Sequence, residues 1–311
     1  MRDYSFDKIS IVIGEQNFEA RKAMRSTLQS NGFRNVEDFS NTEQMRAYVK
    51  GSTPDLIIGD LDLPGGDFCT VCTDIRNQLL ADDPFVPIIL YAGEITPANL
   101  GMISGAGVDH VLQKPISVAD LLIRIRHLIE RRKPFVVTEG YIGPDRRNTV
   151  RDGINDLNLI DLPNVMKAKA ENDTSKIKQL LEERRSAMLT VNTHKVQHHA
   201  ETIVGKVEQV LPMLDEVRTE EATDILNKIL EITTDVQRRL GSTEFGHIAN
   251  LCDVFSDAVF RIDEEKTAAR KDIMLLKPLS QAIVAAFNNE QSSVETAKKI
   301  IHMIDSSIQL D

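Results

Sequence analysis

Short apolar runs alternate with longer amphipathic stretches through the N-terminal part of the chain. The runs that are apolar at nearly every position lie at residues 9–13, 56–58, 88–91 and 108–112. Such runs are typical of strands that are buried on both faces. Between them apolar residues recur at helical spacing, as at Ala20, Met24 and Leu28. The alternation predicts five strand–helix units over residues 9–132 and a parallel sheet that helices cover on both faces.

The middle segment, residues 133–173, breaks this alternation. Residues such as Pro134 and Gly143 predict turns. The segment also carries apolar groups, among them Phe135–Val137, so we expect a docked strap and not a loose tether. We therefore expect a connector here, after an N-terminal domain at residues 1–132.

Residues 174–311 form the predicted C-terminal domain, in which every long segment has the spacing of a helix. Its apolar residues step by three and four, in seams that build coiled-coil-like bundles. The first three seams are Val196, Ala200, Ile203, Val207, Val210 and Leu214; Ala222, Ile225, Ile229, Ile232 and Val236; and Ile248, Leu251, Phe255, Ala258 and Ile262. The last seam is Val294, Ala297, Ile301, Ile304 and Ile308. We expect an all-α bundle of four or five antiparallel helices.

Prolines and glycines divide these predicted helices. The first is expected from about Thr174 to Leu211, and breaks are predicted at Pro212, Gly241-Ser242 and Pro278. A first helix of this length reaches far enough to connect two domains or to cross a dimer, which leaves a homodimer open.

One apolar run, Leu56–Ile58, leads to a carboxylate at Asp60, and the turn Pro64-Gly65 follows soon after. In an open parallel sheet the ligand crevice lies beyond the carboxyl ends of the strands, so we expect Asp60 to face that crevice. The first predicted strand leads to Glu15, and the last leads to Lys114. Two carboxylates and one ammonium are therefore expected at the same edge of the sheet.

Pro54-Asp55-Leu56, Asp60, Pro64-Gly65 and Lys114-Pro115, in this spacing, resemble the receiver domain of two-component response regulators over about residues 7–132. The resemblance implies a flavodoxin-like five-stranded sheet with the order 2-1-3-4-5. It also implies that Asp60 accepts a phosphoryl group, that acids at the first strand help to hold magnesium, and that the lysine contacts the phosphate. The donor would be a histidine kinase or a phosphotransfer protein.

Phosphoryl transfer to a protein requires these residue types. A carboxylate attacks phosphorus to form an acyl phosphate, and cations around it stabilise the developing negative charge. Magnesium prefers oxygen ligands and keeps several waters, so one or two carboxylates and a phosphate oxygen suffice. We expect Glu15, Asp60 and the backbone carbonyl of Asp62 as its ligands, with Lys114 as a mobile point charge for the phosphate.

Three positions depart from the pattern of the family. Gly14-Glu15 stands where two adjacent acids are usual, so magnesium binding is expected to be weak. Ala92 stands where a threonine or serine hydroxyl is usual, and Val111 stands at the aromatic switch position. Either Asp60 is phosphorylated with an altered relay, or the domain is a phosphorylation-independent pseudo-receiver that serves as a scaffold.

Composition and charge restrict the cellular context. The net charge is −10, and the acidic C-terminal half has no clear helix-turn-helix signal, so DNA binding is not expected. No apolar run is long enough to span a membrane, and the first residues lack the apolar core of a signal peptide. Three cysteines cannot form a disulfide framework, which fits a reducing compartment. We expect a cytoplasmic protein with no membrane partner.

Two further motifs have a structural interpretation beside a functional one. Cys69 and Cys72 have the spacing of a redox motif, but they fall on a predicted helix, where Cys72 would face the core. His194, His198 and His199 share a predicted helix, but no further ligand follows nearby. We interpret the cysteines as core residues and the histidines as part of a solvated face.

The segment Gly143-Pro144-Asp145-Arg146-Arg147 places two arginines side by side. Arginines suit a nucleotide that bears phosphate, but short charged turns usually lie at the surface. We interpret this segment as a solvated turn.

The function that we expect is recognition and not catalysis. The helical domain would bind a protein target, and phosphorylation would change the contact between the receiver and the bundle or strap. Residues 151–311 supply no constellation that an enzymatic output would need.

A third alternative is a phosphotransfer protein with phosphate on a bundle histidine, although the family patterns beside such histidines are missing. The histidines in question are His198, His199, His247 and His302.

Overall fold

The computed structural model describes residues 4–147, 159–214, 220–240, 246–264 and 270–288. The chain divides into two compact units, Met1–Val191 and Asn192–Asp311. Helix α7 (Thr174–Leu214) begins in the first unit and ends in the second. Among the described helices, none has the length together with the hydropathy that a membrane span requires.

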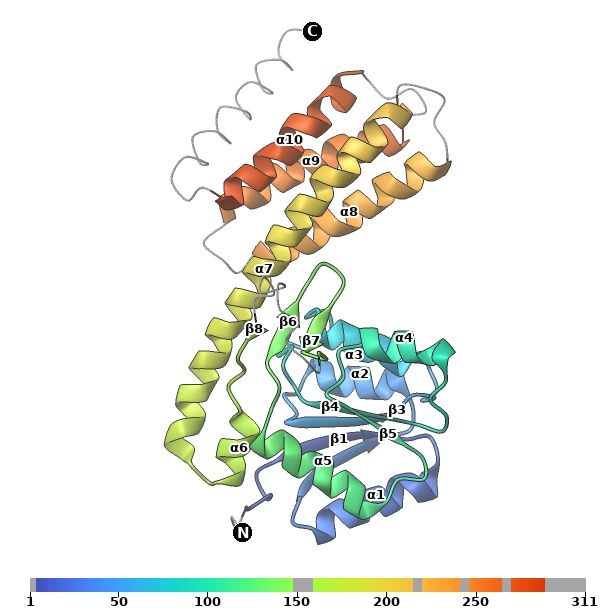
Figure 1. The fold of residues 1–311 in the computed structure, drawn as a ribbon, viewed down its shortest axis with the longest axis vertical. Helices are drawn as coiled ribbons and strands as arrows, with labels where there is room; N and C mark the ends of the chain where they lie inside the picture. Colours follow the sequence, from blue (N-terminus) through green and yellow to red (C-terminus); the bar gives the residue numbers. More distant parts are fainter. Residues whose placement is uncertain (1–3, 148–158, 215–219, 241–245, 265–269, 289–311) are drawn as a thin grey trace. The chain divides into compact units, whose positions relative to one another are not determined.

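The first unit is built on a five-stranded parallel sheet with the order β2-β1-β3-β4-β5 (Figure 1). The strands are β1 (Ser10–Gly14), β2 (Asn35–Phe39), β3 (Leu56–Asp60), β4 (Ile88–Ala92) and β5 (His110–Gln113). Ile58 of β3 pairs with Ile13 on one side and Ile89 on the other, so the carboxyl ends of these strands meet at one edge. The predicted flavodoxin-like sheet and its strand order are confirmed.

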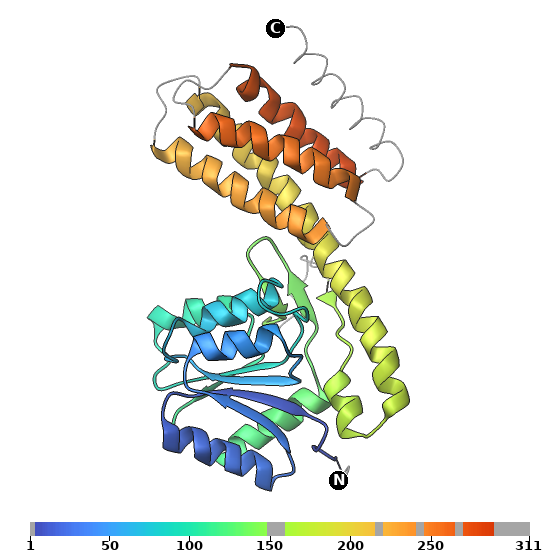
Figure 2. The same ribbon diagram turned by 180° about the vertical axis from the view of Figure 1, so that it is seen from behind.

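Helices cover both faces of this sheet (Figure 2). They are α1 (Phe18–Ser30), α2 (Thr42–Lys50), α3 (Phe68–Arg76), α4 (Pro97–Gly105) and α5 (Val118–Glu130). Met45 of α2, Phe68 of α3 and Ile103 of α4 belong to the hydrophobic core on one face. Leu28 of α1 and Ile125 of α5 belong to the core on the other face.

A polar side chain caps the N-terminus of each of these five helices. The caps are Asn17, Asn41, Asp67, Thr96 and Ser117, and each accepts a hydrogen bond from a backbone N–H of the first turn. Such a cap contributes about 1 kcal/mol. The caps fix where the chain turns from each strand into the next helix, and so they fix the loops at the carboxyl edge of the sheet.

The described residues of the connector fold onto the first unit. They form a small antiparallel sheet with the order β7-β6-β8, and one short helix. These elements are β6 (Phe135–Val137), β7 (Ile142–Pro144), β8 (Leu159–Ile160) and α6 (Val165–Ala170). Phe135 and Val137 are buried in a cluster with Phe85 and with Val191 of α7. The compact unit therefore extends well beyond residue 132.

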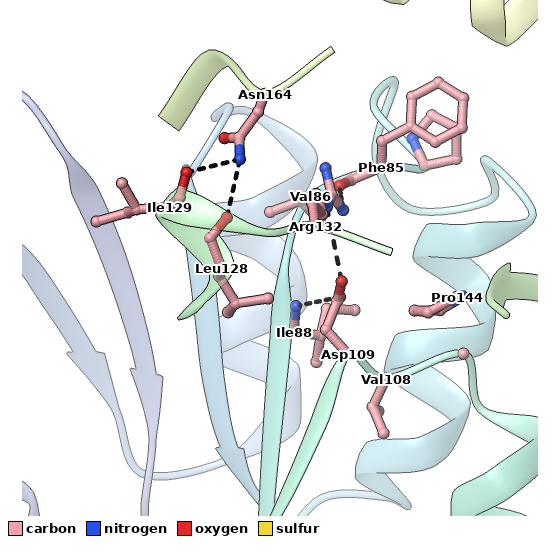
Figure 3. A network of polar contacts seen from close by, with 12 residues as sticks. Phe85, Val86, Ile88, Val108, Asp109, Leu128, Ile129, Arg132, Pro144 and Asn164 are labelled. Carbon is pink, nitrogen blue, oxygen red and sulfur yellow. Dashed lines mark hydrogen bonds and ion pairs between the residues drawn. The ribbon is translucent and has the colours of Figure 1, made fainter. Parts of the chain in front are cut away.

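A buried charge network joins this connector to the amino ends of β4 and β5 (Figure 3). Asp109 Oδ2 accepts hydrogen bonds from Arg76 at 3.0 Å and from a backbone N–H of β4 at 2.9 Å. Arg132 lies 3.6 Å from Asp109 Oδ1 and donates to the carbonyl of Phe85. Both guanidinium groups lie over the ring of Phe135. Residue 109 thus links the amino end of β5 to the connector.

Helix α6 is held by two polar contacts. The amide of Asn164 donates to the carbonyls of Leu128 and Ile129, at 2.9 and 3.0 Å (Figure 3). These carbonyls lie in the last turn of α5, where no helical N–H follows to bond them. Lys169 Nζ lies 2.7 Å from both carboxylate oxygens of Asp55. The connector is therefore fixed to α5 and to the loop before β3.

The described part of the second unit is helical, as predicted. It contains the end of α7 together with α8 (Glu220–Leu240), α9 (Gly246–Glu264) and α10 (Arg270–Asn288). The predicted seams of the first three helices lie in one hydrophobic core, with Leu214 packed against it. The seam at residues 294–308 and the break at Gly241-Ser242 lie outside the described residues.

Two prolines that were predicted to end helices lie inside them instead. Helix α7 continues through Pro212 to Leu214, and Pro278 lies within α10. A proline has no N–H to donate, so Pro278 leaves the carbonyl of residue 274 without its helical hydrogen bond. Met274 is 71% exposed, while Leu276 and Leu279 are fully buried. Packing on both sides of Pro278 therefore outweighs the local preference to break the helix.

Candidate functional site

The carboxyl edge of the sheet brings together Asp60, Glu15 and Lys114. Asp60 is the last residue of β3, Glu15 follows β1, and Lys114 follows β5. Lys114 Nζ lies 2.6 Å from Asp60 Oδ2 and 3.7 Å from Glu15 Oε2. The strand ends place these three residues at one edge because the strands are parallel, with β1 beside β3 and only β4 between β3 and β5.

Burial strengthens the electrostatic interactions between the charged groups of this cluster. Asp60 is fully buried, Glu15 is 3% exposed, and the side chain of Lys114 is 35% exposed. Burial lowers the pKa of Lys114, but the hydrogen bond to Asp60 and the charges of Asp60, Glu15 and Asp62 outweigh it and raise the net pKa. The lysine is therefore held as an ammonium ion between two carboxylates.

The turn after β3 lies beside the acceptor carboxylate. The backbone N–H of Asp62 lies 3.4 Å from Asp60 Oδ1, and the side chain of Asp62 is exposed. Lys114 also holds the neighbouring strand, because its backbone N–H donates to the carbonyl of Ala92 at 2.8 Å. The loops after β3, β4 and β5 are thus fixed to one another at the site.

The two switch positions offer no polar side chain to the site. Ala92 is fully buried in the core under α3 and α4. Val111 packs against the same core. Neither side chain can donate a hydrogen bond to a phosphoryl oxygen.

The site can hold a magnesium ion, but it supplies few ligands of its own. Glu15 and Asp60 both reach one cation, the Lys114 ammonium, so their oxygens converge on a common region. Two carboxylates and a backbone carbonyl suffice for magnesium when waters and a phosphate oxygen complete the shell. Within the described residues, no group of three or more His, Cys, Asp or Glu side chains is placed to hold a metal ion.

Tyr91 is a member of this cluster that the sequence did not reveal. Its hydroxyl lies 2.8 Å from the carbonyl of Gly14 and 3.2 Å from Glu15 Oε2. Burial raises the pKa of Tyr91 above its usual range, and the charge of Glu15 raises it further. The signal that could have pointed to it is a phenol within an otherwise apolar strand.

The two cysteines of α3 lie in the core. Cys72 is fully buried and Cys69 is 3% exposed. Burial raises the pKa of Cys69 to about 12 and raises the pKa of Cys72 well above its usual value. Thiols of this kind are poor nucleophiles, which supports the core interpretation.

The three histidines of α7 do not form a solvated face, because His199 is buried. Its Nε2 lies 2.9 Å from Asp235 Oδ2 on α8, and burial lowers its pKa. His194 and His198 are partly buried. The sequence could not show this pairing, because Asp235 lies on another helix.

The two arginines of the segment 143–147 differ from each other. Arg147 forms two hydrogen bonds of 2.9 Å to Asp145. Arg146 lies 3.2 Å from the hydroxyl of Tyr141 and donates to the carbonyl of Val108 at 3.3 Å. The interpretation as a solvated turn is wrong for Gly143 and Pro144, which are buried in β7, whereas both arginines are exposed as expected.

Comparisons with known proteins agree with this architecture. Residues 11–126 match the family of the response regulator receiver domain. The chain is 33% identical over 95 residues to the transcriptional regulatory protein BaeR of Escherichia coli O6:H1, and 30% identical over 114 residues to the response regulator MprA of Mycobacterium leprae. These matches cover 30% and 37% of this chain, and 38% and 48% of the respective relatives. The chain thus spans half or less of the length of these two relatives.

Two solved structures resemble the same part of the chain. The chemotaxis response regulator CheY4 of Vibrio cholerae is 22% identical, with a TM-score of 0.35, and the match covers 38% of this chain and 97% of that one. The receiver domain of the sensor histidine kinase PA1611 of Pseudomonas aeruginosa PAO1, solved with a magnesium ion in its active site cleft, is 26% identical. Its TM-score is 0.35, and the match covers 38% of this chain and 94% of that one. Residues 11–126 of this chain are a response regulator receiver domain, and the chain continues beyond it into a helical region.

Proposed function

We propose that this chain is a response regulator of a two-component system, and that Asp60 accepts a phosphoryl group from a histidine kinase or a phosphotransfer protein. The observation that carries the proposal is the convergence of Asp60, Glu15 and Lys114 at the carboxyl edge of the sheet. Two carboxylates against one ammonium leave the cluster with a net negative charge. Such a cluster suits a divalent cation that brings a phosphoryl group with it.

The transfer would form an O–P bond and break the N–P bond of a phosphohistidine. A carboxylate oxygen of Asp60 attacks phosphorus, and the leaving imidazole keeps the electron pair of the broken bond and takes up a proton from water. Lys114 must first move away from Asp60 Oδ2, and its partly exposed side chain leaves it free to do so. The ammonium can then bond to the oxygens of the transferred group.

Magnesium would be held by Glu15, Asp60 and the backbone carbonyl of Asp62. When bound, it would neutralise negative charge on the phosphoryl oxygens. Gly14 contributes no second acid beside Glu15. We therefore expect magnesium to bind weakly.

Strand β5 offers a route from the acceptor site to the connector. Lys114 follows its carboxyl end, and Asp109 precedes its amino end. Asp109 is joined to Arg132, which lies just before the connector and over the ring of Phe135 in it. A movement of Lys114 toward a phosphoryl group would act on the carboxyl end of β5. This strand has four residues, and Asp109 holds its amino end to Arg132. This arrangement supports a population shift in the contact between receiver and connector, in place of the missing hydroxyl and aromatic groups.

The helical region would carry the output, as a surface that binds a protein target. It would act by recognition and not as an enzyme. Helix α7 makes the covalent connection, because it begins in the unit of the receiver and ends in the helical unit. We expect the chain to meet its kinase and its protein target, and to form any homodimer, in the cytoplasm.

The proposal is tested by the intact mass of the full chain after incubation with magnesium and acetyl phosphate or phosphoramidate. We expect the wild type to gain one phosphoryl group and Asp60→Asn to gain none. Asp82→Asn is the matched control, because it changes an exposed acid outside the cluster and should still gain phosphate. Size-exclusion chromatography of the same samples reports whether phosphate changes the assembly or shape. A wild type that gains no phosphate from these donors or from a purified kinase would contradict the proposal.

A phosphorylation-independent scaffold is the second candidate, and the buried alanine at position 92 favours it. Normal biological function of the Asp60→Asn protein would support the scaffold. A phosphotransfer protein receives no support from His199, which is buried and bonded to Asp235, and His302 lies outside the described residues. Acid-labile phosphate on a histidine of the helical region would support that alternative.

A further inference from the structure

Tyr91 is the one residue of β4 whose side chain carries a polar group. It lies in the sequence Ile88-Ile89-Leu90-Tyr91-Ala92 and is 1% exposed. Its ring belongs to the core beneath α1 and α5, the opposite face from Ala92. A buried phenol requires a hydrogen-bond partner, since leaving it unpaired costs about 1–3 kcal/mol. The chain could have used an aliphatic residue at this position, so the hydroxyl itself needs an explanation.

The partners of this hydroxyl are the last residue of β1 and the acid that follows it. It lies 2.8 Å from the carbonyl of Gly14 and 3.2 Å from Glu15 Oε2. The other carboxylate oxygen of Glu15 accepts the backbone N–H of Asn17 at 2.8 Å. Arg21 also donates to the backbone carbonyl of Glu15 at 2.7 Å. Contacts from β4 and from the start of α1 thus fix the orientation of this carboxylate.

The ring of Tyr91 also contacts the cation of the site. Lys114 Nζ lies 5.2 Å from the centre of the ring, within the range of a cation–π interaction. The same ammonium lies 2.6 Å from Asp60 Oδ2. One side chain therefore touches both of the charged groups that flank the acceptor aspartate.

Glu15 has no acid beside it at position 14, where the chain has a glycine packed against the core. A Cβ at Gly14 would lie 2.7 Å from Leu63 Cδ2 and 3.2 Å from Met45 Sδ. The core packs against the backbone where a second carboxylate would begin. The direction in which the first strand presents negative charge therefore depends on Glu15, and the single hydroxyl proton of Tyr91 is shared between Glu15 Oε2 and the nearer carbonyl of Gly14.

We propose that Tyr91 is a positioning residue of the phosphoryl-acceptor site, which orients Glu15 for magnesium through its hydroxyl and places Lys114 through its ring. The inference rests on the proposed function, because it assigns a role in the same site. It predicts that the hydroxyl acts on magnesium binding and that it contributes little to the transfer step once magnesium is bound.

The test compares wild type with Tyr91→Phe, which removes the hydroxyl and keeps the ring. Tyr48→Phe is the matched control, since Tyr48 is a partly exposed residue of α2. Magnesium is titrated into each unphosphorylated full chain while backbone amide NMR resonances of residues 14–17 and 60–62 are followed. We expect Tyr91→Phe to raise the magnesium dissociation constant about tenfold, which matches the loss of one hydrogen bond to a charged group. Tyr48→Phe should leave it within twofold.

A second measurement separates positioning from a merely structural role. Phosphate gain from acetyl phosphate is followed by intact mass at rising magnesium concentrations. We expect Tyr91→Phe to raise the half-saturating magnesium concentration by a similar factor and to change the maximal rate less than threefold. A variant with the wild-type dissociation constant and half-saturation would overturn the inference, as would an equal loss of rate at every magnesium concentration.

The two proposals fail in distinguishable ways. If the wild type takes up no phosphate but Tyr91→Phe still weakens magnesium binding, the acceptor function is wrong and the positioning role stands. If the wild type is phosphorylated and Tyr91→Phe behaves like it in both measurements, only the inference about Tyr91 is wrong. Thermal unfolding of each variant shows that the comparison is made on folded protein.

Discussion

Both ends of the central sheet carry a buried carboxylate that is bonded to a cation. At the amino end Asp109 meets Arg76 and Arg132, and at the carboxyl end Asp60 meets Lys114. The side chains of Arg76 and Arg132 are 1% and 8% exposed, against 35% for Lys114. The two clusters are similar in composition, but they differ in access to solvent and in the balance of charge.

The hydrogen bonds show why the amino-end cluster is structural. The guanidinium of Arg76 donates to the carbonyls of Gly107, Pro84 and Val86, at 2.7–2.8 Å, as well as to Asp109. Arg76 spends its donors on these buried acceptors and is closed to solvent, so it offers little to a ligand. The carboxyl-end cluster has an excess of negative charge and one partly exposed cation, which are properties that suit a reactive site.

The largest expected effect follows from removing the amino-end cation. Arg76→Met should lower the free energy of unfolding of the first unit by about 3–5 kcal/mol, because three carbonyls and a buried carboxylate lose their donor. Hydrogen exchange of β3 and β4 amides measures this loss. Lys114→Met removes the cation at the carboxyl end of the sheet. We expect it to lower the hydrogen-exchange protection of these amides by less than half as much as Arg76→Met does, and to lower phosphate uptake. Equal losses of protection in the two variants would break the comparison.

A smaller effect is expected where the connector approaches the loop before β5. Gly107 has φ +71°, and a Cβ there would lie 2.5 Å from the carbonyl oxygen of Ile142. Gly107→Ala should therefore cost about 2–4 kcal/mol, since both the backbone conformation and the contact are strained. Gly105→Ala is the matched control, because its Cβ would meet nothing within 4 Å, and in α4 it should gain up to about 1 kcal/mol. Urea unfolding of the two variants measures the difference. A harmless Gly107→Ala would show that the connector is not closely packed here.

The smallest expected effect is a change in the free energy of unfolding with pH, caused by a histidine of β5. Burial lowers the pKa of His110 to about 4, and the charges of His127, Arg124 and Lys133 lower it while that of Asp109 raises it. The folded pKa lies below the unfolded value, so the neutral form stabilises the fold. This contribution is complete above about pH 6.5 and is lost as the pH falls toward 4. After allowance for partial exposure, the loss amounts to about 1–2 kcal/mol.

Urea unfolding at pH 7.5 and pH 4.5 measures this effect. His110→Gln should remove it, so the wild type should lose more stability than the variant over this interval. His127→Gln should reduce the effect only in part, since the charge of this exposed neighbour is one of several causes that lower the pKa of His110. The same pH dependence in wild type and His110→Gln would place the titrating group elsewhere.

The sequence predicts the carboxyl-end site better than it predicts the amino-end network. Asp60, Glu15 and Lys114 each follow a strand of its own, so strand ends in a parallel sheet bring them together without knowledge of side-chain contacts. Asp109 and Arg76 are 33 positions apart and meet only because α3 and β5 pack in tertiary structure. No periodicity in either segment encodes that meeting.

Two other features lie beyond the reach of local sequence rules. The strands of the connector are two or three residues long, too short for an alternating pattern to show. Pro278 was misjudged because the rule that prolines end helices ignores the burial of Leu276 and Leu279 beside it. The helical seams were predicted correctly because they repeat over several turns.

The central claim is that Asp60 carries the phosphoryl group. Reduction of the phosphorylated full chain with borohydride converts an acyl phosphate to an alcohol, so that a modified aspartate is recovered as homoserine in peptide mass spectrometry. The account predicts homoserine at position 60 in the wild type and at no position in Asp60→Asn. Homoserine at another aspartate, or phosphate that resists borohydride and is located on a histidine, would contradict it.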